Sequence, residues 1–236
     1  MEVKKVVTSM CERFSLIADV AELQEKFQIN KIMTSPKDRF NILPTQSIPV
    51  IIGGQKDRQL VEARWGLFPF WAKDSINADY DSVSRKPIFE RIVKRQRCIV
   101  PCSGFYGTKT EGKVSEEVRF IVRDQDVFGM AGLFETRIDP RGVLHRTFTV
   151  VTTTPNHVVS RYNDRMPVIM DEEERESWLD PTLIDSRMLG NRVYAYAASR
   201  MHVYPVAPRA KGTLPEEESP EMIQEFGTGG AAWLKK

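Results

Sequence analysis

The sequence has little of what marks a secreted, membrane-spanning or metal-holding protein. It contains three cysteines and three histidines, no apolar run long enough to cross a bilayer, and no signal-peptide pattern. These absences favour a reducing cytoplasm as its location. An excess of charge of one sign is also missing, because 34 basic and 32 acidic side chains leave a formal net charge of +2. Nucleic-acid binding would therefore have to come from a local basic patch.

Internal repeats and linkers rich in proline, glycine or serine are absent as well, which predicts one domain from the 236 residues. The two ends differ from the rest of the chain. Residues 1–10 precede the first periodic segment, and residues 227–236 combine three glycines with polar residues. We therefore expect an N-terminal extension at 1–10, a domain at 11–226 and a flexible C-terminal tail at 227–236, in a monomeric protein.

Three short helices are predicted from capping residues and apolar spacing. Asp19 is placed as an N-cap with Glu22 three residues on, and apolar residues follow at helical spacing as far as Phe27. A second helix fits residues 86–94, with a proline in its first turn. The acidic run from Asp171 predicts the start of a third helix, because the helix dipole favours negative charge there.

Short runs rich in β-branched and aromatic residues predict most of the remaining structure to be strands. These runs are VEARWGLF, RCIVPCSGFY, VRFIV, VFGMAGLF, RTFTVVTT and MPVIM. They do not alternate with long helices, which disfavours a doubly wound parallel sheet. The predicted fold class is therefore α+β, with a strand-rich, mixed or antiparallel, barrel-like sheet flanked by short helices. The acidic run at residues 216–218 is expected to be a solvated loop.

Several segments also occur in order as motifs. They are MCERF, RFNILPTQ, RWGLFPFWAKD, INADYD, RCIVPCSGFYG, GMAGLFE, VTTTPN and NDRMPVIM. Together they resemble the SOS response-associated peptidase (SRAP) family, the abasic-site-processing proteins, from Met10 to about Phe226. The resemblance implies a single SRAP-like domain that binds single-stranded DNA in a basic cleft and captures the ring-opened sugar of an abasic site, in the DNA damage response.

Cys11 matches the family cysteine that follows the initiator methionine. Once that methionine is removed, one residue carries a free α-amine and a thiol, so the amine can condense with the abasic aldehyde and the thiol can close a thiazolidine ring. In this chain an amide joins Cys11 to Met10, and an amide cannot react in this way. Two alternatives stay open: translation starts at Met1 and Cys11 is a relic, or initiation or cleavage at Met10 exposes it.

Asn77 and Asp79 lie in the INAD motif. Asn77 matches the family asparagine that hydrogen-bonds the crosslinked sugar, although a turn or capping role is the alternative. Two residues on, the family carries an arginine that contacts DNA phosphate, and here Asp79 replaces it. The lost contact removes ~0.7 from the salt slope on single strands, and the new negative charge adds repulsion.

Two proton-transfer groups of the family are missing. Gly107 stands at the position of the family glutamate, and Asn163 stands at the position of the family histidine. An asparagine can orient a group through hydrogen bonds but cannot shuttle protons near neutral pH. Glu111 and His157 are conceivable substitutes, although a solvated loop role and a structural role are the simpler interpretations. General acid–base groups contribute about 10²- to 10⁴-fold each, so slow chemistry is expected rather than none.

Residues suited to DNA binding are better preserved. Arg13 and Arg165 match phosphate-binding positions of the family, and Trp65 and Trp71 bracket the RWGL-x-P-x-W loop. Bases can stack on aromatic faces while cations follow the backbone, with core packing as the alternative for each tryptophan. A basic helix face could extend this track or could simply be solvated; its residues are Arg91, Lys94, Arg95 and Arg97.

No metal and no other cofactor is expected. Cys98 and Cys102 form a C-x₃-C pair, but no second Cys/His pair has ligand spacing, so both are interpreted as core residues. Two functions are consistent with the motifs: an abasic-site-processing enzyme of altered efficiency, or a single-stranded DNA-binding module that has lost the reaction. A general thiol peptidase is a weaker third interpretation, because the motif places no histidine or glutamate beside the thiol.

Overall fold

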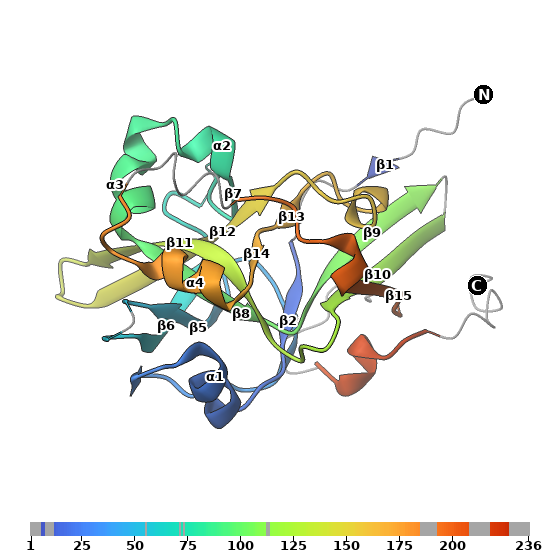
Figure 1. Cartoon of the computed structure of the whole chain (residues 1–236), viewed down its shortest axis with the longest axis horizontal. Helices are drawn as coiled ribbons and strands as arrows, with labels where there is room; N and C mark the ends of the chain where they lie inside the picture. The colour runs from blue at the N-terminus through green and yellow to red at the C-terminus, as the bar shows by residue number, and fades with distance from the viewer. Residues whose placement is uncertain are drawn as a thin grey trace.

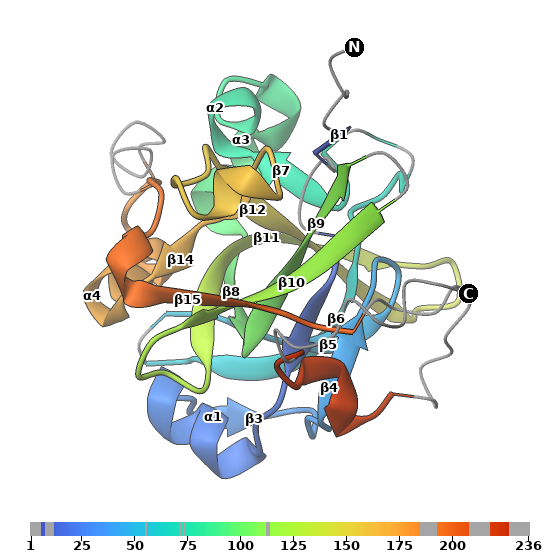
Figure 2. The ribbon, with the colours of Figure 1, turned by 90° about the vertical axis from the view of Figure 1, so that its right-hand side faces the viewer.

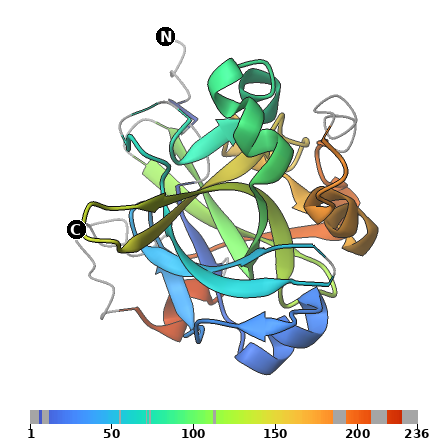
Figure 3. The ribbon, with the colours of Figure 1, turned by 90° about the vertical axis from the view of Figure 1, so that its left-hand side faces the viewer.

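A computed structural model describes residues 6–7, 12–54, 56–70, 72, 74–111, 114–184, 193–207 and 218–226. Its centre is a closed barrel of five strands, in which β12 pairs with β11, then β8, β5 and β6 follow, and β6 returns to β12. These strands are β5 (Ser47–Ile52), β6 (Gln59–Trp65), β8 (Arg97–Cys102), β11 (Phe128–Ile138) and β12 (Leu144–Thr153). All their pairings are antiparallel except β12 with β6, where Thr147 lies beside Arg64 in a parallel register. Figure 3 shows the hairpin of β11 and β12, in olive, extending beyond the barrel.

A second sheet runs in the order β15, β10, β9, β2 and β4, and its pairings are antiparallel. Its strands are β2 (Phe14–Leu16), β4 (Arg39–Ile42), β9 (Gly104–Glu111), β10 (Val114–Val122) and β15 (Met201–Pro205). Four shorter strands extend the barrel sheet: β3 (Lys31–Ile32), β7 (Asn77–Asp79), β13 (Met166–Pro167) and β14 (Ile169–Met170). The predicted α+β, barrel-like fold class is therefore confirmed.

Short helices close the ends of the barrel. Figures 1 and 2 show α1 (Val20–Phe27) at one end, and α2 (Tyr80–Val83) and α3 (Pro87–Arg95) at the other. The Asp19 carboxylate accepts the backbone N–H of Glu22 at 2.9 Å, so the predicted N-cap is confirmed. The predicted third helix is α4 (Glu172–Leu179), which begins with a capping box between Asp171 and Glu174. No helix in the described ranges is long and apolar enough to span a membrane.

One apolar core fills the space between the sheets. Phe14 of β2 meets Trp65 of β6 edge-to-face with ring centroids 4.9 Å apart, and Trp65 stacks on Phe148 of β12. The predicted core role of Cys98 and Cys102 is confirmed, since both side chains are fully buried. Burial also raises the pKa of the Cys98 thiol, which makes it a poor nucleophile.

Both ends of the chain lie largely outside the described residues. Within the predicted extension, however, Val6 and Val7 form the short strand β1, which pairs with Thr110 and Lys109 of β9. These two residues are therefore not a detached tail. The expectation of a solvated loop is wrong for Glu218, whose buried carboxylate accepts the backbone N–H groups of Phe40 and Asn41.

Candidate functional site

The strand β7 carries two predicted site residues into the barrel sheet. Asn77 and Asp79 lie beside Val150 and Thr152 of β12 in a parallel register. Successive residues of a strand point to opposite faces, so Asn77 and Asp79 share a face. Asn77 is 1% exposed. The structure therefore buries Asn77 and places Asp79 two residues farther along the same face of β7.

Trp65 supports this strand from the core. Its indole N–H donates to the Ile76 carbonyl at 2.8 Å, directly before Asn77, and its ring is fully buried. The prediction that Trp65 stacks on DNA bases is therefore wrong, because no base can reach the ring. Its alternative role in core packing is the observed one, and the indole positions the start of β7. Trp71, the second predicted aromatic, lies outside the described residues.

An ion pair occupies the place where the family resemblance implied two cations. The Arg165 guanidinium donates to the Asp79 carboxylate at 2.7 Å and to the Thr152 carbonyl at 2.8 Å. The same Asp79 oxygen accepts the backbone N–H of Asp81 and caps α2. Arg165 therefore lies beside the end of β7, and the aspartate compensates its charge.

The positions of the missing glutamate and histidine lie against each other. A Cβ atom added to Gly107 would lie 2.8 Å from the Tyr162 Cβ, 2.8 Å from the Phe120 ring and 3.1 Å from the Asn163 Oδ1. Asn163 is 1% exposed, and its amide donates to the Tyr106 carbonyl at 3.1 Å. Tyr162 and Asn163 therefore fill the volume in which a longer side chain at residue 107 would begin.

Tyr162, which was not singled out in the sequence, thus belongs to the site. Its ring packs edge-to-face on Phe120, and burial together with the charge of Glu116 raises the pKa of its phenol. The phenol is therefore protonated at neutral pH. Only its position immediately before Asn163 could have pointed to it.

Neither proposed substitute reaches this position directly. His157 is exposed in the turn before the short helix η1 (Val159–Arg161). Glu111 ends β9 opposite Val114, four residues beyond Gly107. At about 3.3 Å per strand residue, this places its backbone ~13 Å away from that of Gly107.

Arg13 lies on the other face of β9. Its guanidinium carbon is 3.8 Å from the centroid of the Tyr106 ring, and it forms an ion pair with Glu117 of β10. Both side chains are largely buried. Burial raises the pKa of the Tyr106 phenol, an effect that the charges of Arg13 and Arg119 oppose. In this structure Arg13 anchors the start of β2, and the predicted phosphate contact would require its pair with Glu117 to open.

Cys11 lies outside the described residues, but the segments before and after it in the sequence both pair with β9. Val7 is opposite Lys109, and Phe14 is opposite Phe105. Gly107 lies midway between Phe105 and Lys109 on this strand.

The loop from β6 to β7 presents a different aromatic residue to solvent. Phe68 is 54% exposed, and the Arg137 guanidinium lies 4.6 Å from the centroid of its ring. Phe70 meets Phe68 edge-to-face and lies under Arg64. Phe68 is therefore the described aromatic of this loop that a base can reach. The sequence signal for Phe68 is its place directly before Pro69 in the RWGL-x-P-x-W loop motif.

The predicted basic track along α3 is reduced. Arg97 is buried, and it donates to the carbonyls of Val93, Lys94, Trp178 and Asp180. Its charge therefore fastens α3 to α4 and is not available for DNA. Lys94 pairs with Glu90, whereas Arg91 and Arg95 are exposed. In the described ranges, no cluster of His, Cys, Asp and Glu side chains is arranged to hold a metal.

Comparison with known proteins confirms the family resemblance. The family model described as SOS response associated peptidase (SRAP) matches residues 10–211. The abasic site processing protein YoqW of Bacillus subtilis is 34% identical over 224 residues, which cover 91% of this chain and 99% of that protein. YoaM of the same organism, also an abasic site processing protein, is 32% identical over 225 residues, which cover 91% of this chain and 97% of YoaM.

A solved structure supports the fold independently. The crystal structure of a protein from Bacteroides thetaiotaomicron matches with a TM-score of 0.79 at 23% identity. The match covers 92% of this chain and all of that one.

Proposed function

The chain belongs to the SOS response associated peptidase family, and from that premise we propose that it binds single-stranded DNA and processes abasic sites through Cys11. The observation that carries the proposal is the convergence of five predicted positions at one end of the barrel. Asn77 and Asp79 come from β7, Gly107 from β9, and Asn163 and Arg165 from the segment between η1 and β13. The names of the relatives YoqW and YoaM support the same role.

The proposed reaction needs an N-terminal Cys11. Its α-amine attacks the aldehyde carbon of the ring-opened sugar, and loss of water leaves an imine. The thiol then adds to the imine carbon, the nitrogen takes up a proton, and a thiazolidine ring joins protein to DNA. Because an α-amine has a pKa near ~8, an appreciable fraction of it is neutral at physiological pH.

This chain's residues would bind and orient more than they transfer protons. Asn77 would hydrogen-bond the sugar. Arg165 would release Asp79 and bind a phosphate in its place. Gly107 has no side chain, and the Asn163 amide is bound to the Tyr106 carbonyl, so neither supplies a proton. Solvent would have to supply the proton, and capture would be slower by ~10²- to 10⁴-fold for each general acid–base group that is missing.

The test compares three proteins with a single strand that carries one abasic site. Protein made from Met10, with the methionine removed, should give an adduct that survives denaturation on a gel. The matched variant Cys11→Ser keeps the amine but cannot form the stable ring, so it should give none. Full-length protein that mass spectrometry shows to be intact should also give none, because its Cys11 nitrogen is an amide.

The opposite results are equally informative. Equal adduct yield from intact full-length protein would end the amine mechanism for this chain. If the Met10 protein gave no adduct but still bound the strand, the site would bind DNA without reacting. A duplex bound as tightly as the single strand would contradict the single-strand preference.

A further inference from the structure

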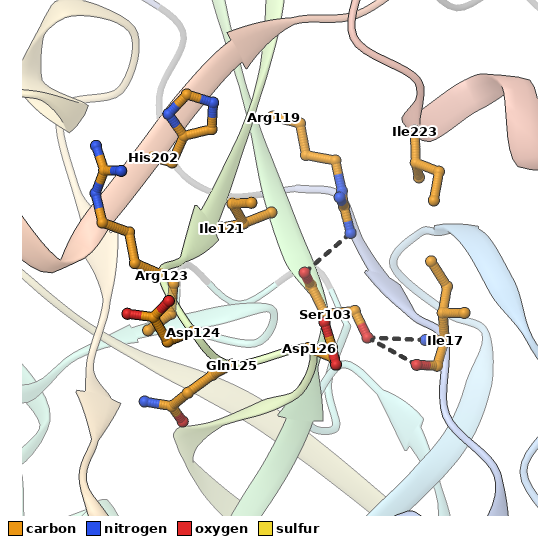
Figure 4. A pocket seen from close by; sticks show the side chains of 11 residues that line it. Ile17, Ser103, Arg119, Ile121, Arg123, Asp124, Gln125, Asp126, His202 and Ile223 are labelled. Atoms are coloured by element: carbon orange, nitrogen blue, oxygen red, sulfur yellow. Dashed lines mark hydrogen bonds between the residues drawn. The ribbon is translucent and has the colours of Figure 1, made fainter.

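A cavity beside the second sheet shares no residue with the site around β7. Its volume is about 670 Å³, and it lies between β10, β15 and the turn that leads from β10 to β11. Ile223, on the short helix η4 (Pro220–Ile223), borders it from the other side. A volume of this size is ordinary for a pocket that binds a small molecule. Figure 4 shows the side chains that line it.

A buried cation lines this cavity. Arg119 is only 6% exposed, and its partners are all uncharged: the Tyr204 hydroxyl at 2.6 Å, the Ser15 hydroxyl at 3.1 Å and the Ser103 carbonyl at 2.9 Å. Among the described residues its Nε has no hydrogen-bond partner, and no carboxylate forms an ion pair with the guanidinium. A buried charge that lacks a counter-ion is costly, so this guanidinium favours the approach of an anion.

Gly104 of β9 lies in close contact with the Arg119 guanidinium. A Cβ atom at Gly104 would lie 2.6 Å from the Arg119 Nε and 2.7 Å from its guanidinium carbon. The absence of a side chain at residue 104 therefore allows the guanidinium to lie flat against β9. Any larger residue there would displace it.

Two further donors share its face of the sheet. Arg119 and Ile121 share a face of β10, and His202 of β15 lies opposite Ile121. Arg123 directly follows the last residue of β10 and also lines the cavity. Arg123 is exposed, its Nε donates to the Met201 carbonyl at 3.0 Å, and its guanidinium lies beside His202 in Figure 4. This side of the cavity is therefore suited to an oxyanion.

The opposite side is rich in acceptors. Figure 4 shows Arg119 and His202 above Ile121, and Asp124, Gln125 and Asp126 below it. Carboxylates accept hydrogen bonds from hydroxyl groups. The cavity thus offers cations to one end of a ligand and hydroxyl acceptors to the other, with apolar contact between them.

We propose that this cavity binds a small polyhydroxylated anion of the sugar-phosphate class, with its phosphate toward Arg119 and Arg123 and its hydroxyls toward Asp124 and Asp126. This site is independent of the proposed DNA function, and its test contains no DNA.

The test is isothermal titration calorimetry of the full chain with ribose 5-phosphate, inorganic phosphate and ribose. Ribose 5-phosphate should bind most tightly, phosphate more weakly, and ribose not measurably. Arg123→Ala should weaken ribose 5-phosphate and phosphate at least about tenfold, the loss expected for a charge-assisted hydrogen bond. Asp126→Ala should weaken only ribose 5-phosphate.

A matched control is Arg141→Ala, which removes an exposed arginine from the hairpin of β11 and β12 and should change nothing. The rim variants avoid the buried Arg119, whose loss could unfold the chain. No heat with any ligand at millimolar concentration, or wild-type affinity in Arg123→Ala, would overturn the proposal. Equal affinity for phosphate and ribose 5-phosphate would refute the sugar-binding half.

Discussion

Asp79 forms an ion pair with the Arg165 guanidinium, the group that we propose binds a DNA phosphate. The variant Asp79→Asn tests whether the two anions compete for this guanidinium. The two side chains meet at 2.7 Å, and Asp79 is 38% and Arg165 21% exposed. An asparagine keeps nearly the same shape and can still accept the Asp81 N–H that caps α2. The substitution therefore removes one negative charge from the site and leaves Arg165 without its counter-ion.

The expected gain follows from counterion release. One phosphate contact on a single strand contributes ~0.7 to the slope of log K against log salt concentration, which corresponds to about eightfold in affinity at 50 mM salt and about fourfold at 150 mM. The ion pair itself stabilises the folded chain by only ~0.2–1 kcal/mol, because both groups are partly exposed. The melting temperature should therefore change little while DNA binding improves.

Fluorescence anisotropy with a labelled single strand, titrated at several salt concentrations, measures both quantities. The matched control Glu173→Gln removes one negative charge from the exposed start of α4 and should leave slope and affinity unchanged. Arg165→Ala should abolish the gain in the double variant with Asp79→Asn. An Asp79→Asn slope equal to that of the wild type would place this ion pair away from the DNA and refute the reasoning.

Three other perturbations follow from the structure. Phe68→Ala should weaken single-strand binding by about 1–3 kcal/mol in an anisotropy titration if a base stacks on its exposed ring; an unchanged dissociation constant would remove this loop from the interface. Gly107→Glu should lower the free energy of unfolding in urea by about 1–3 kcal/mol, because its Cβ meets Tyr162 and Phe120 at 2.8 Å, and it should not accelerate adduct formation. Glu218→Gln should cost about 1–3 kcal/mol in the same assay, since the acceptor of the Phe40 and Asn41 N–H groups loses its charge and the ion pair with Arg39 is removed; a wild-type midpoint would show that this charge does not stabilise the fold.

Local features of the fold could be predicted because their causes are local. The cap at Asp19 and the capping box at Asp171 each depend on residues three or four positions apart. The barrel was indicated by many short strands without intervening long helices. Closure through the parallel contact of β12 with β6 joins residues about 83 positions apart, a pairing that no local pattern contains.

The sequence motifs predict which residues belong to the candidate site, but they do not predict the contacts between those residues. The motifs named Asn77, Asp79 and Arg165, yet the ion pair depends on β7 lying beside β12, which brings together residues 86 positions apart. Trp65 was misassigned because the sequence motif is the same whether the tryptophan ring faces solvent or the core. Glu218 was misassigned for a related reason, since only tertiary structure places its carboxylate against the free N–H groups of an edge strand.

The replacements at Gly107 and Asn163 are structurally coupled, because the two residues lie against each other. With glycine at 107, there is room for the Tyr162 Cβ and the Asn163 amide to close over β9, and the amide gains a hydrogen bond to the Tyr106 carbonyl. A glutamate at 107 alone would meet those atoms, and a histidine at 163 alone would face a backbone with no carboxylate beside it. We therefore expect that reversal of either replacement alone does not restore a proton relay. The proposed capture would then depend on the Cys11 amine and thiol, and Asn77 and Arg165 would hold the strand.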